Sequence, residues 1–374
     1  MKIVIGADLV PRESSEKYFV DGDVDTLFSD VLPIMQGADR TIVNLECALT
    51  RSDNAIKKFG PNLKADPDCA PALKKAGITD IALSNNHVFD FGVEGLCDTV
   101  DALKKAGLPY TGVGNDDQDS RTIYYMEQKG LKVAVVNVCE HEYTYATPNR
   151  MGANPFDPFI TMQDIRTAKA NSDYVIVLYH GGKEHCCYPS PRLLQLCREM
   201  VHNGAGTVLT QHSHCIGCYE NYNGSHILYG QGNFHFTKTN AVSASGNDMW
   251  DTCLLTELDI NPKTKKANIK FYPLRMNTLT LTLAKGDDAK GIMDAFEKRN
   301  EELKNGKWQD GWHEFCVSVQ NGYIAAVQNY VDDSDERLKH HFAHYLDCEA
   351  HTDVWRELFK TWNYTNELDK NRKI

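Results

Sequence analysis

Short apolar runs rich in β-branched residues recur along the first part of the chain, and polar residues follow each of them. Five such runs lie at residues 3–7, 41–43, 81–83, 174–179 and 207–210. Short apolar runs bounded by Gly, Asn or Asp are typical of strands that are buried on both faces. Amphipathic helical patterns separate several of the runs, and this alternation predicts an α/β fold.

The remaining pattern completes the predicted order of elements. Apolar residues at helical spacing predict helices at residues 25–35, 68–76, 92–106, 161–171 and 192–202. The glycine at position 130 predicts a β-hairpin turn between strands at residues 122–127 and 131–138. Short runs joined by turns predict further, antiparallel strands at residues 217–222, 226–229, 252–260 and 268–274.

A boundary is predicted where the pattern becomes helical. From residue 287 onward apolar residues recur at helical spacing, and helices are expected at residues 340–346 and 354–362 among others. We therefore expect a domain of residues 1–284 followed by a helical C-terminal region of residues 285–374.

Composition narrows the class of protein. The net charge is −11 and no basic patch stands out, which argues against a nucleic-acid partner bound by phosphate neutralisation. No run reaches the length of about 18 apolar residues that a membrane span needs. Asp8 and Arg12 interrupt the N-terminal apolar run, so no signal peptide is expected. The 12 cysteines are scattered through a 374-residue chain, which favours reduced thiols and a cytoplasmic location.

The residues that follow the five predicted strands are of the kinds that bind metal ions. They are Asp8, Glu46, Asn86, His180, His212 and His214. Ligands of open α/β sheets lie outside the carboxyl ends of the strands, so we expect these residues to line one edge of one sheet. Residues two apart in an extended chain point to the same side, which would direct both His212 and His214 toward a metal.

This set of side chains suits a dinuclear metal site. In two-metal hydrolases, two divalent ions about 3.5–4 Å apart clamp the substrate and the attacking water, and a carboxylate must bridge the ions. Glu46 follows a strand, where a bridging carboxylate would sit, and Asn86 offers a neutral oxygen. Mixed nitrogen and oxygen ligands favour Mn, Fe or Zn over Ca or Mg.

His87 follows Asn86 directly and would project away from the metal ligands in an extended segment. This placement favours an outer-sphere role, in which His87 protonates a leaving group or holds the substrate. Asp90 lies three residues further on and would orient His87 through a hydrogen bond. We therefore predict His87 and Asp90 as the catalytic pair.

Several of these residues also have an ordinary structural interpretation. Asp8 could cap a helix, Asn86 could belong to a turn, and His180 could be a hydrogen-bonded core histidine. Asp90 and Glu184 could be solvated side chains.

Two further features have alternative interpretations. For Lys58 and Arg12, a solvated face is favoured over the binding of an anionic group. Cys215 and Cys218 form a Cys-x-x-Cys pair next to His214, and this pair would also suit a structural zinc site.

Six short motifs occur in one order along the chain. They are Gly-Ala-Asp8, Asn44-Leu-Glu46, Asn85-Asn86-His87 with Asp90, His180-Gly-Gly, His212-Ser-His214 and Tyr229-Gly-Gln-Gly232-Asn233-Phe234. Over about residues 1–275 the chain therefore resembles the CapA family of bacterial capsule (poly-γ-glutamate) synthesis proteins. Proteins of that family resemble the calcineurin-like metallophosphoesterases in fold.

The resemblance implies a four-layer α/β/β/α sandwich and phosphoester-type hydrolysis with two divalent metal ions. It implies metal contacts from the six residues at the predicted strand ends and a catalytic role for His87. The substrate would be a small molecule or an anionic polymer, and other capsule-synthesis proteins would be partners. The alternative is a non-catalytic binding or scaffold protein that helps to assemble an anionic capsule polymer.

The sequence departs from the metallophosphoesterase pattern at two ligand positions. An Asp-x-His motif opens a typical site of this kind, but Val10 stands where the imidazole would be expected. Glu46 stands where a Gly-Asp motif would bring an aspartate. One of the two metal positions is therefore expected to be rebuilt or weaker.

Overall fold

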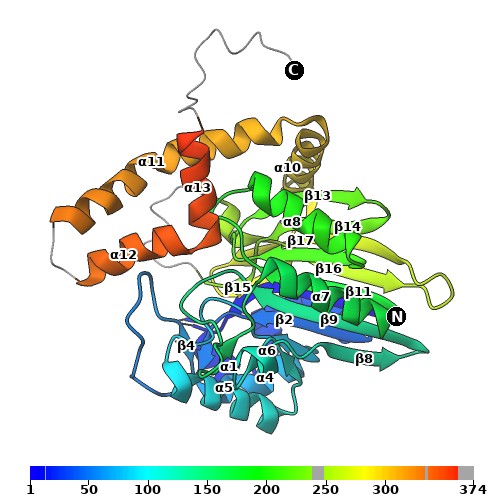
Figure 1. Ribbon diagram of the computed structural model, residues 1–374. Helices are drawn as coiled ribbons and strands as arrows, with labels where there is room; N and C mark the ends of the chain where they lie inside the picture. Colours follow the sequence, from blue (N-terminus) through cyan, green and yellow to red (C-terminus); the bar gives the residue numbers. More distant parts are fainter. Residues whose placement is uncertain (13, 238–247, 333–335, 361–374) are drawn as a thin grey trace.

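Two β-sheets pack face to face at the centre of the computed structural model, which describes residues 1–12, 14–237, 248–332 and 336–360 (Figure 1). Side chains of both sheets form the core between them, including Ile5 from the first sheet and Ile176 and Leu209 from the second. Helices pack on the two outer faces. The layers are thus helix, sheet, sheet and helix, which confirms the predicted four-layer sandwich.

The first sheet joins parallel strands from the start of the chain to antiparallel strands from later in it. Its order is β18 (Thr280–Leu283), β17 (Ala267–Asn277), β16 (Thr252–Ile260), β1 (Lys2–Val10), β2 (Arg40–Leu45), β5 (Asp80–Ala82) and β6 (Tyr110–Thr111). A further strand, β15 (Asn233–Phe236), pairs in parallel with the carboxyl end of β1.

The second sheet has a parallel centre between two antiparallel edges. Its order is β13 (Ile216–Tyr222), β14 (Ser225–Gln231), β12 (Thr207–Gln211), β11 (Tyr174–His180), β9 (Leu131–Cys139) and β8 (Tyr124–Gln128). β8 and β9 form the predicted hairpin. Two small sheets pair β3 (Ala48–Leu49) with β4 (Lys64–Ala65), and β7 (Val113–Gly114) with β10 (Gly152–Ala153).

Each sheet carries its own group of helices. The first sheet is covered by α1 (Glu16–Val20), α2 (Val24–Phe28), α3 (Leu32–Gln36), α4 (Ala70–Lys75) and α5 (Gly92–Ala106). The second is covered by α7 (Pro158–Ala170) and α8 (Pro191–His202). The short helix α6 (Asp117–Ser120) lies beside β7 and β10, and single 3₁₀ turns occur at Ser29–Val31, Pro67–Cys69 and Asp248–Asp251.

The prediction that five strand ends line one edge of one sheet is wrong. β1, β2 and β5 belong to the first sheet, whereas β11 and β12 belong to the second. The chain begins a new sheet at the β8–β9 hairpin. An apolar run shows that a strand is buried but not which strand it pairs with, because pairing is decided by contacts distant in sequence.

The helix predicted at residues 25–35 is broken in the middle. α2 ends at Phe28, Ser29 has a positive φ of 40°, and α3 begins only at Leu32. Pro33 stands in the first turn of α3, where its missing N–H costs no hydrogen bond. The break therefore follows from a proline that suits the start of a helix and not its interior.

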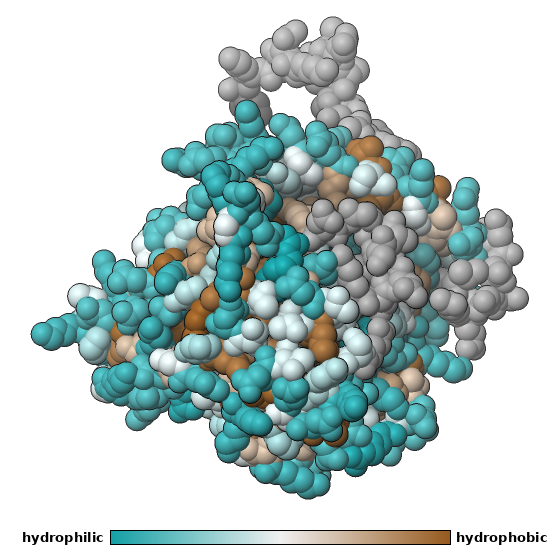
Figure 2. Space-filling view, turned by 180° about the vertical axis from the view of Figure 1, so that it is seen from behind, coloured by the Kyte–Doolittle hydropathy of each residue, from teal (hydrophilic) through white to brown (hydrophobic). Residues whose placement is uncertain are grey.

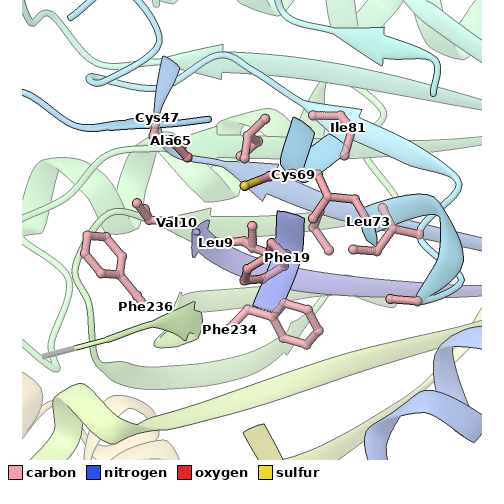
Figure 3. Packing of buried hydrophobic residues seen from close by; sticks show 14 of the residues in the cluster. Leu9, Val10, Phe19, Cys47, Ala65, Cys69, Leu73, Ile81, Phe234 and Phe236 are labelled. Carbon is pink, nitrogen blue, oxygen red and sulfur yellow. The ribbon is translucent and has the colours of Figure 1, made fainter. Parts of the chain in front are cut away.

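Strands near the site are buried on both faces. In β1, Ile5 packs between the sheets, while Leu9 packs on the helix side. Figure 3 shows Leu9 beside Phe19 and Phe234 in this outer core. Burial of both faces explains why the strand is an unbroken apolar run and does not alternate with polar residues.

The C-terminal region consists of α10 (Gly286–Asn305), α11 (Trp308–Asp332), α12 (Glu336–Asp347) and α13 (Glu349–Phe359). Phe296 of α10 enters the core between the sheets, and Trp312 of α11 and Val354 of α13 pack with α8 over the second sheet. The helix predicted at 354–362 thus begins earlier, and residues 361 and 362 lie outside the described part. The division of the chain after residue 284 stays a prediction.

The face shown in Figure 2 is mainly hydrophilic, with hydrophobic residues in small separate areas. Among the described helices, none combines the length and the apolar character that crossing a bilayer requires.

The core between the sheets gives a stability prediction. Ile176 is fully buried there, so Ile176→Ala should lower the free energy of unfolding by about 2–5 kcal/mol, because it removes apolar contacts and leaves a cavity. Urea denaturation followed by circular dichroism would measure the change. Phe159→Ala is the control, since Phe159 is 83% exposed and its loss should change stability by no more than about 0.5 kcal/mol.

Candidate metal centre

Side chains from both sheets meet where the carboxyl ends of the central strands come together. Asp8 lies in β1, Glu46 follows β2, and His180 ends β11. His212 and His214 follow β12. Their ligand atoms form groups lying within 4.8 Å of one another, one made of Asp8, Glu46 and His214 and another of Glu46, His180 and His212. Glu46 belongs to both groups, as expected of a carboxylate between two ions.

Asp8 is held in place by several donors. Asn44 Nδ2 donates to Asp8 Oδ1 at 2.8 Å, and the backbone N–H of His212 donates to Asp8 Oδ2 at 3.1 Å. His214 Nδ1 lies 3.5 Å from Oδ2. Burial opposes ionisation, but the His214 hydrogen bond and nearby imidazole charges outweigh it and lower the pKa of Asp8 to about 2. Asp8 is therefore an anion at neutral pH.

Glu46, in contrast to Asp8, has no hydrogen-bond donor among the described residues. Both of its carboxylate oxygens are buried, and neither makes a hydrogen bond. Burial first, and then the charge of Asp8, raise the pKa of Glu46 well above its ordinary value. A buried carboxylate without donors is costly, and a bound cation would relieve that cost. The donor set therefore fits the metal ions implied by the resemblance.

His180 faces Asn86 and Glu46 with one ring nitrogen. Its Nε2 lies 2.9 Å from Asn86 Oδ1 and 3.4 Å from Glu46 Oε1, and its Nδ1 lies 3.2 Å from Asn44 Nδ2. Burial is the main cause that lowers the pKa of His180 to about 4. The ring is therefore neutral at pH 7, which is the form that binds metal ions. All six predicted ligands thus lie together.

His212 and His214 do not reach the site in the predicted way. β12 ends at Gln211, and the two histidines have positive φ angles of 84° and 54° instead of an extended backbone. A positive φ angle costs a residue other than glycine of order 1–3 kcal/mol in conformational free energy, and such residues cluster at functional sites. A tight turn, and not the two-residue period of a strand, brings both rings to the ligand group.

The predicted catalytic pair forms a hydrogen bond beside the ligands. His87 Nδ1 lies 2.6 Å from Asp90 Oδ2, which also accepts from the backbone N–H of Leu63. Asp90 is fully buried, and its pKa is lowered despite that burial because His87 and Lys58 lie next to it. Asp90 is therefore a carboxylate that fixes the orientation of the His87 ring.

Lys58 lies beside His87 and Asp90. The prediction that Lys58 lies on a solvated face is therefore wrong. Its side chain is only 3% exposed, and Nζ lies 2.5 Å from Asp90 Oδ1 and 3.2 Å from His87 Nδ1. Burial first and the Lys58 charge second lower the pKa of His87 to about 4. The sequence offers no signal for this, because Lys58 lies in an irregular stretch more than 25 residues before its partners.

Three asparagines form hydrogen bonds that hold predicted ligands in place. The sequence pattern does not predict this role for them. Asn85 Nδ2 donates to Asn44 Oδ1 at 3.0 Å, and Asn44 in turn donates to Asp8. Asn233 Oδ1 lies 2.9 Å from His214 Nδ1, which leaves the other ring nitrogen of His214 for a metal. The Asn-rich strand ends were the available signal, since carboxamides can both donate and accept within a buried network.

Glu184 lies closer to the site than its solvated interpretation suggests. Its carboxylate forms a third group with His212 and His214, again with ligand atoms within 4.8 Å. In contrast, no group of metal-binding atoms found among the described residues includes a cysteine. Cys215 and Cys218 therefore do not gather with the histidines as a structural zinc site would require.

C-terminal helices contact two loops of the site. Phe59, next to Lys58, stacks on His341 of α12 with ring centroids 3.9 Å apart, and Figure 1 shows α12 beside this loop. Arg192 of α8 donates to Asp353 of α13 and to Glu140. The other carboxylate oxygen of Glu140 accepts from the N–H of Gly182, two residues after His180. The helices thus help to hold both loops.

Comparisons with known proteins give the context of this site. Residues 2–238 match the family model described as "Bacterial capsule synthesis protein PGA_cap". A Bacillus anthracis protein, "Capsule biosynthesis protein CapA", is 32% identical over 221 residues, which are 57% of this chain and 54% of that protein. A Bacillus subtilis (strain 168) protein, "PGA biosynthesis protein CapA", is 29% identical over 295 residues, 74% of this chain and 76% of that protein.

Among solved structures, one described as a novel phosphatase from Mycoplasma pneumoniae is similar over 74% of this chain and 93% of its own. The identity is 15% and the TM-score 0.47. The match with the Bacillus anthracis relative spans about half of that protein's length.

Removal of the Glu46 charge should stabilise the metal-free protein. Glu46 has a raised pKa when folded, so its ionisation at a pH above its ordinary value of about 4.5 favours the unfolded chain. In EDTA, Glu46→Gln should therefore melt at a higher temperature than the wild type. The difference should grow as the pH rises from 5 to 8, by up to about tenfold in the folding equilibrium per pH unit.

With saturating Mn²⁺ the order of the two melting temperatures should reverse, because only the wild type keeps the carboxylate that belongs to both groups of candidate ligand atoms. Thermal melts of both proteins across this pH range would measure the effect. A Glu46→Gln protein that melts below the wild type in EDTA at every pH would contradict the assignment of Glu46 as an uncompensated buried charge.

Proposed function

Because the chain belongs to the bacterial capsule synthesis protein family, we propose that it is a hydrolase with a dinuclear metal site. The substrate we propose is a phosphoester or a polyglutamate-related polymer, and the partners are other capsule-synthesis proteins. The names of the two Bacillus relatives refer to capsule and PGA biosynthesis, which supports this context. The proposal rests chiefly on one observation, namely that the buried carboxylate of Glu46, whose oxygens accept no hydrogen bond, belongs to two groups of candidate ligand atoms.

The residues divide into two ligand sets around Glu46. Asp8 and His214 would hold one ion, and Asn86, His180 and His212 the other. Bound Mn, Fe or Zn supplies a Lewis acid and lowers the pKa of a water molecule, so that a nucleophile is available at neutral pH. Neutral His180 and anionic Asp8 are already in the protonation states that metal binding needs.

In this proposal His87 transfers a proton to the leaving group. Asp90 accepts from Nδ1, so Nε2 is the nitrogen left for exchange with a substrate. Burial first and the charge of Lys58 second lower the pKa of His87 and keep its imidazole neutral. An anionic substrate placed near Nε2 would raise the pKa of His87 and make it a proton donor to the leaving group.

Two variants should separate metal binding from proton transfer. His87→Ala should lower kcat by about 10²- to 10⁴-fold on an active phosphoester substrate, because it removes the proton donor. Its metal content should stay at the wild-type level, since His87 is not a ligand. His202→Ala, in an exposed histidine of α8, is the matched control and should leave kcat unchanged.

Metal content tests the dinuclear site directly. Apo-protein equilibrated with Mn, Fe or Zn should bind two equivalents, and His212→Ala should bind fewer, as measured by elemental analysis after gel filtration. Binding of no more than one equivalent by the wild type would contradict the dinuclear hydrolase and favour the non-catalytic scaffold in its place.

A further inference from the structure

We propose that Glu184 is an additional metal ligand, whose carboxylate takes the place of the imidazole missing from the Asp-x-His position. This inference rests on the proposed dinuclear site and extends it. It assigns Glu184 to the ion held by Asp8 and His214.

The backbone brings Glu184 to the histidines. The loop after β11 runs alongside the loop after β12, because Gly181 donates to the carbonyl of Gln211 at 3.1 Å and His185 donates to the carbonyl of Ser213 at 2.8 Å. Glu184 lies between these two attachment points. Its position is therefore set by two backbone hydrogen bonds and not by a free loop.

The carboxylate of Glu184 is close to nitrogen ligands and not engaged elsewhere. Its oxygens, His212 and His214 place ligand atoms within 4.8 Å of one another. Within the described part of the chain, its one polar side-chain contact is with Lys183 Nζ, at 3.5 Å. That distance is longer than a charge-assisted hydrogen bond. Lys183 therefore does not account for the position of this carboxylate.

His212 shows a second, independent sign of a missing partner. Its side chain is almost completely buried, and its Nδ1 makes no hydrogen bond. A buried imidazole nitrogen without a partner points to a ligand at this place. A carboxylate oxygen of Glu184 lies within 4.8 Å of a ring nitrogen of His212.

The ligand count shows which ion needs Glu184. The ion near His180 has four candidate side chains, those of Glu46, Asn86, His180 and His212. The ion near Asp8 has three, those of Asp8, Glu46 and His214. Val10 cannot supply the fourth, since it is apolar and buried in the core on the helix side of β1. Glu184 groups with His212 of the first set and with His214 of the second, and we assign it to the second because that set has fewer candidate side chains.

A third carboxylate would also change the metal preference. Two divalent ions bring four positive charges, and Asp8, Glu46 and Glu184 together bring three negative ones. Oxygen-rich sites suit harder cations such as Mn²⁺ better than nitrogen- and sulfur-preferring ones. We therefore expect the position of Asp8 and Glu184 to prefer Mn²⁺ over Zn²⁺.

Mn²⁺ titration of the full chain, followed by electron paramagnetic resonance of free Mn²⁺, tests the inference. The wild type should show two sites. Glu184→Gln should keep one and weaken the other at least tenfold, and Glu184→Asp should fall between them. Glu199→Gln, an exposed glutamate of α8, and Lys183→Gln are controls that should keep both sites. Circular dichroism melts of each variant establish that it is folded.

The outcomes distinguish this inference from the function on which it rests. If Glu184→Gln binds two Mn²⁺ with wild-type affinity, Glu184 is not a ligand and the dinuclear site stands without it. If Lys183→Gln weakens binding as much as Glu184→Gln, the ion pair and not ligation is responsible, and the inference fails. If the wild type itself binds fewer than two ions, both proposals fall.

Discussion

The burial of Glu46 beside Asp8 is the constraint on which the rest of the site depends. Two carboxylates share a place that water does not reach, and the Glu46 oxygens have no donor. Asn44 donates a hydrogen bond to Asp8 and His214 lies beside it, whereas no described donor hydrogen-bonds to Glu46. Such a site is stable only when a proton or a cation neutralises the second charge. The surrounding histidines and carboxamides are the side chains that would hold a cation in our proposal, which makes Glu46 the link between structure and proposed chemistry.

Strand ends were predictable from the sequence because their signal is local. A short apolar run followed by Asp8 or His180 indicates both burial and the point at which the strand stops. The division into two sheets was not predictable, since it depends on which strands pair. The resemblance to a known family supplied the four-layer arrangement that the apolar pattern alone did not.

Other parts of the site depend on packing between distant segments. Lys58 reaches Asp90 because its loop is held there by a backbone hydrogen bond from Ile56 to Asp90. Glu184 reaches His214 because two loops share backbone hydrogen bonds. Neither residue follows a strand directly, so neither stood out by the rule that found the others. The left-handed turn at His212 shows the same limit, because a pattern of residue types does not reveal a positive φ.

The contacts of α12 and α13 with the two loops of the site have a consequence for folding during synthesis. Phe59 and Glu140 leave the ribosome long before His341 and Asp353, to which they are tied directly or through Arg192. Domains tend to form from the N-terminus onward during translation. Both loops therefore lack these contacts until α12 and α13 have been synthesised.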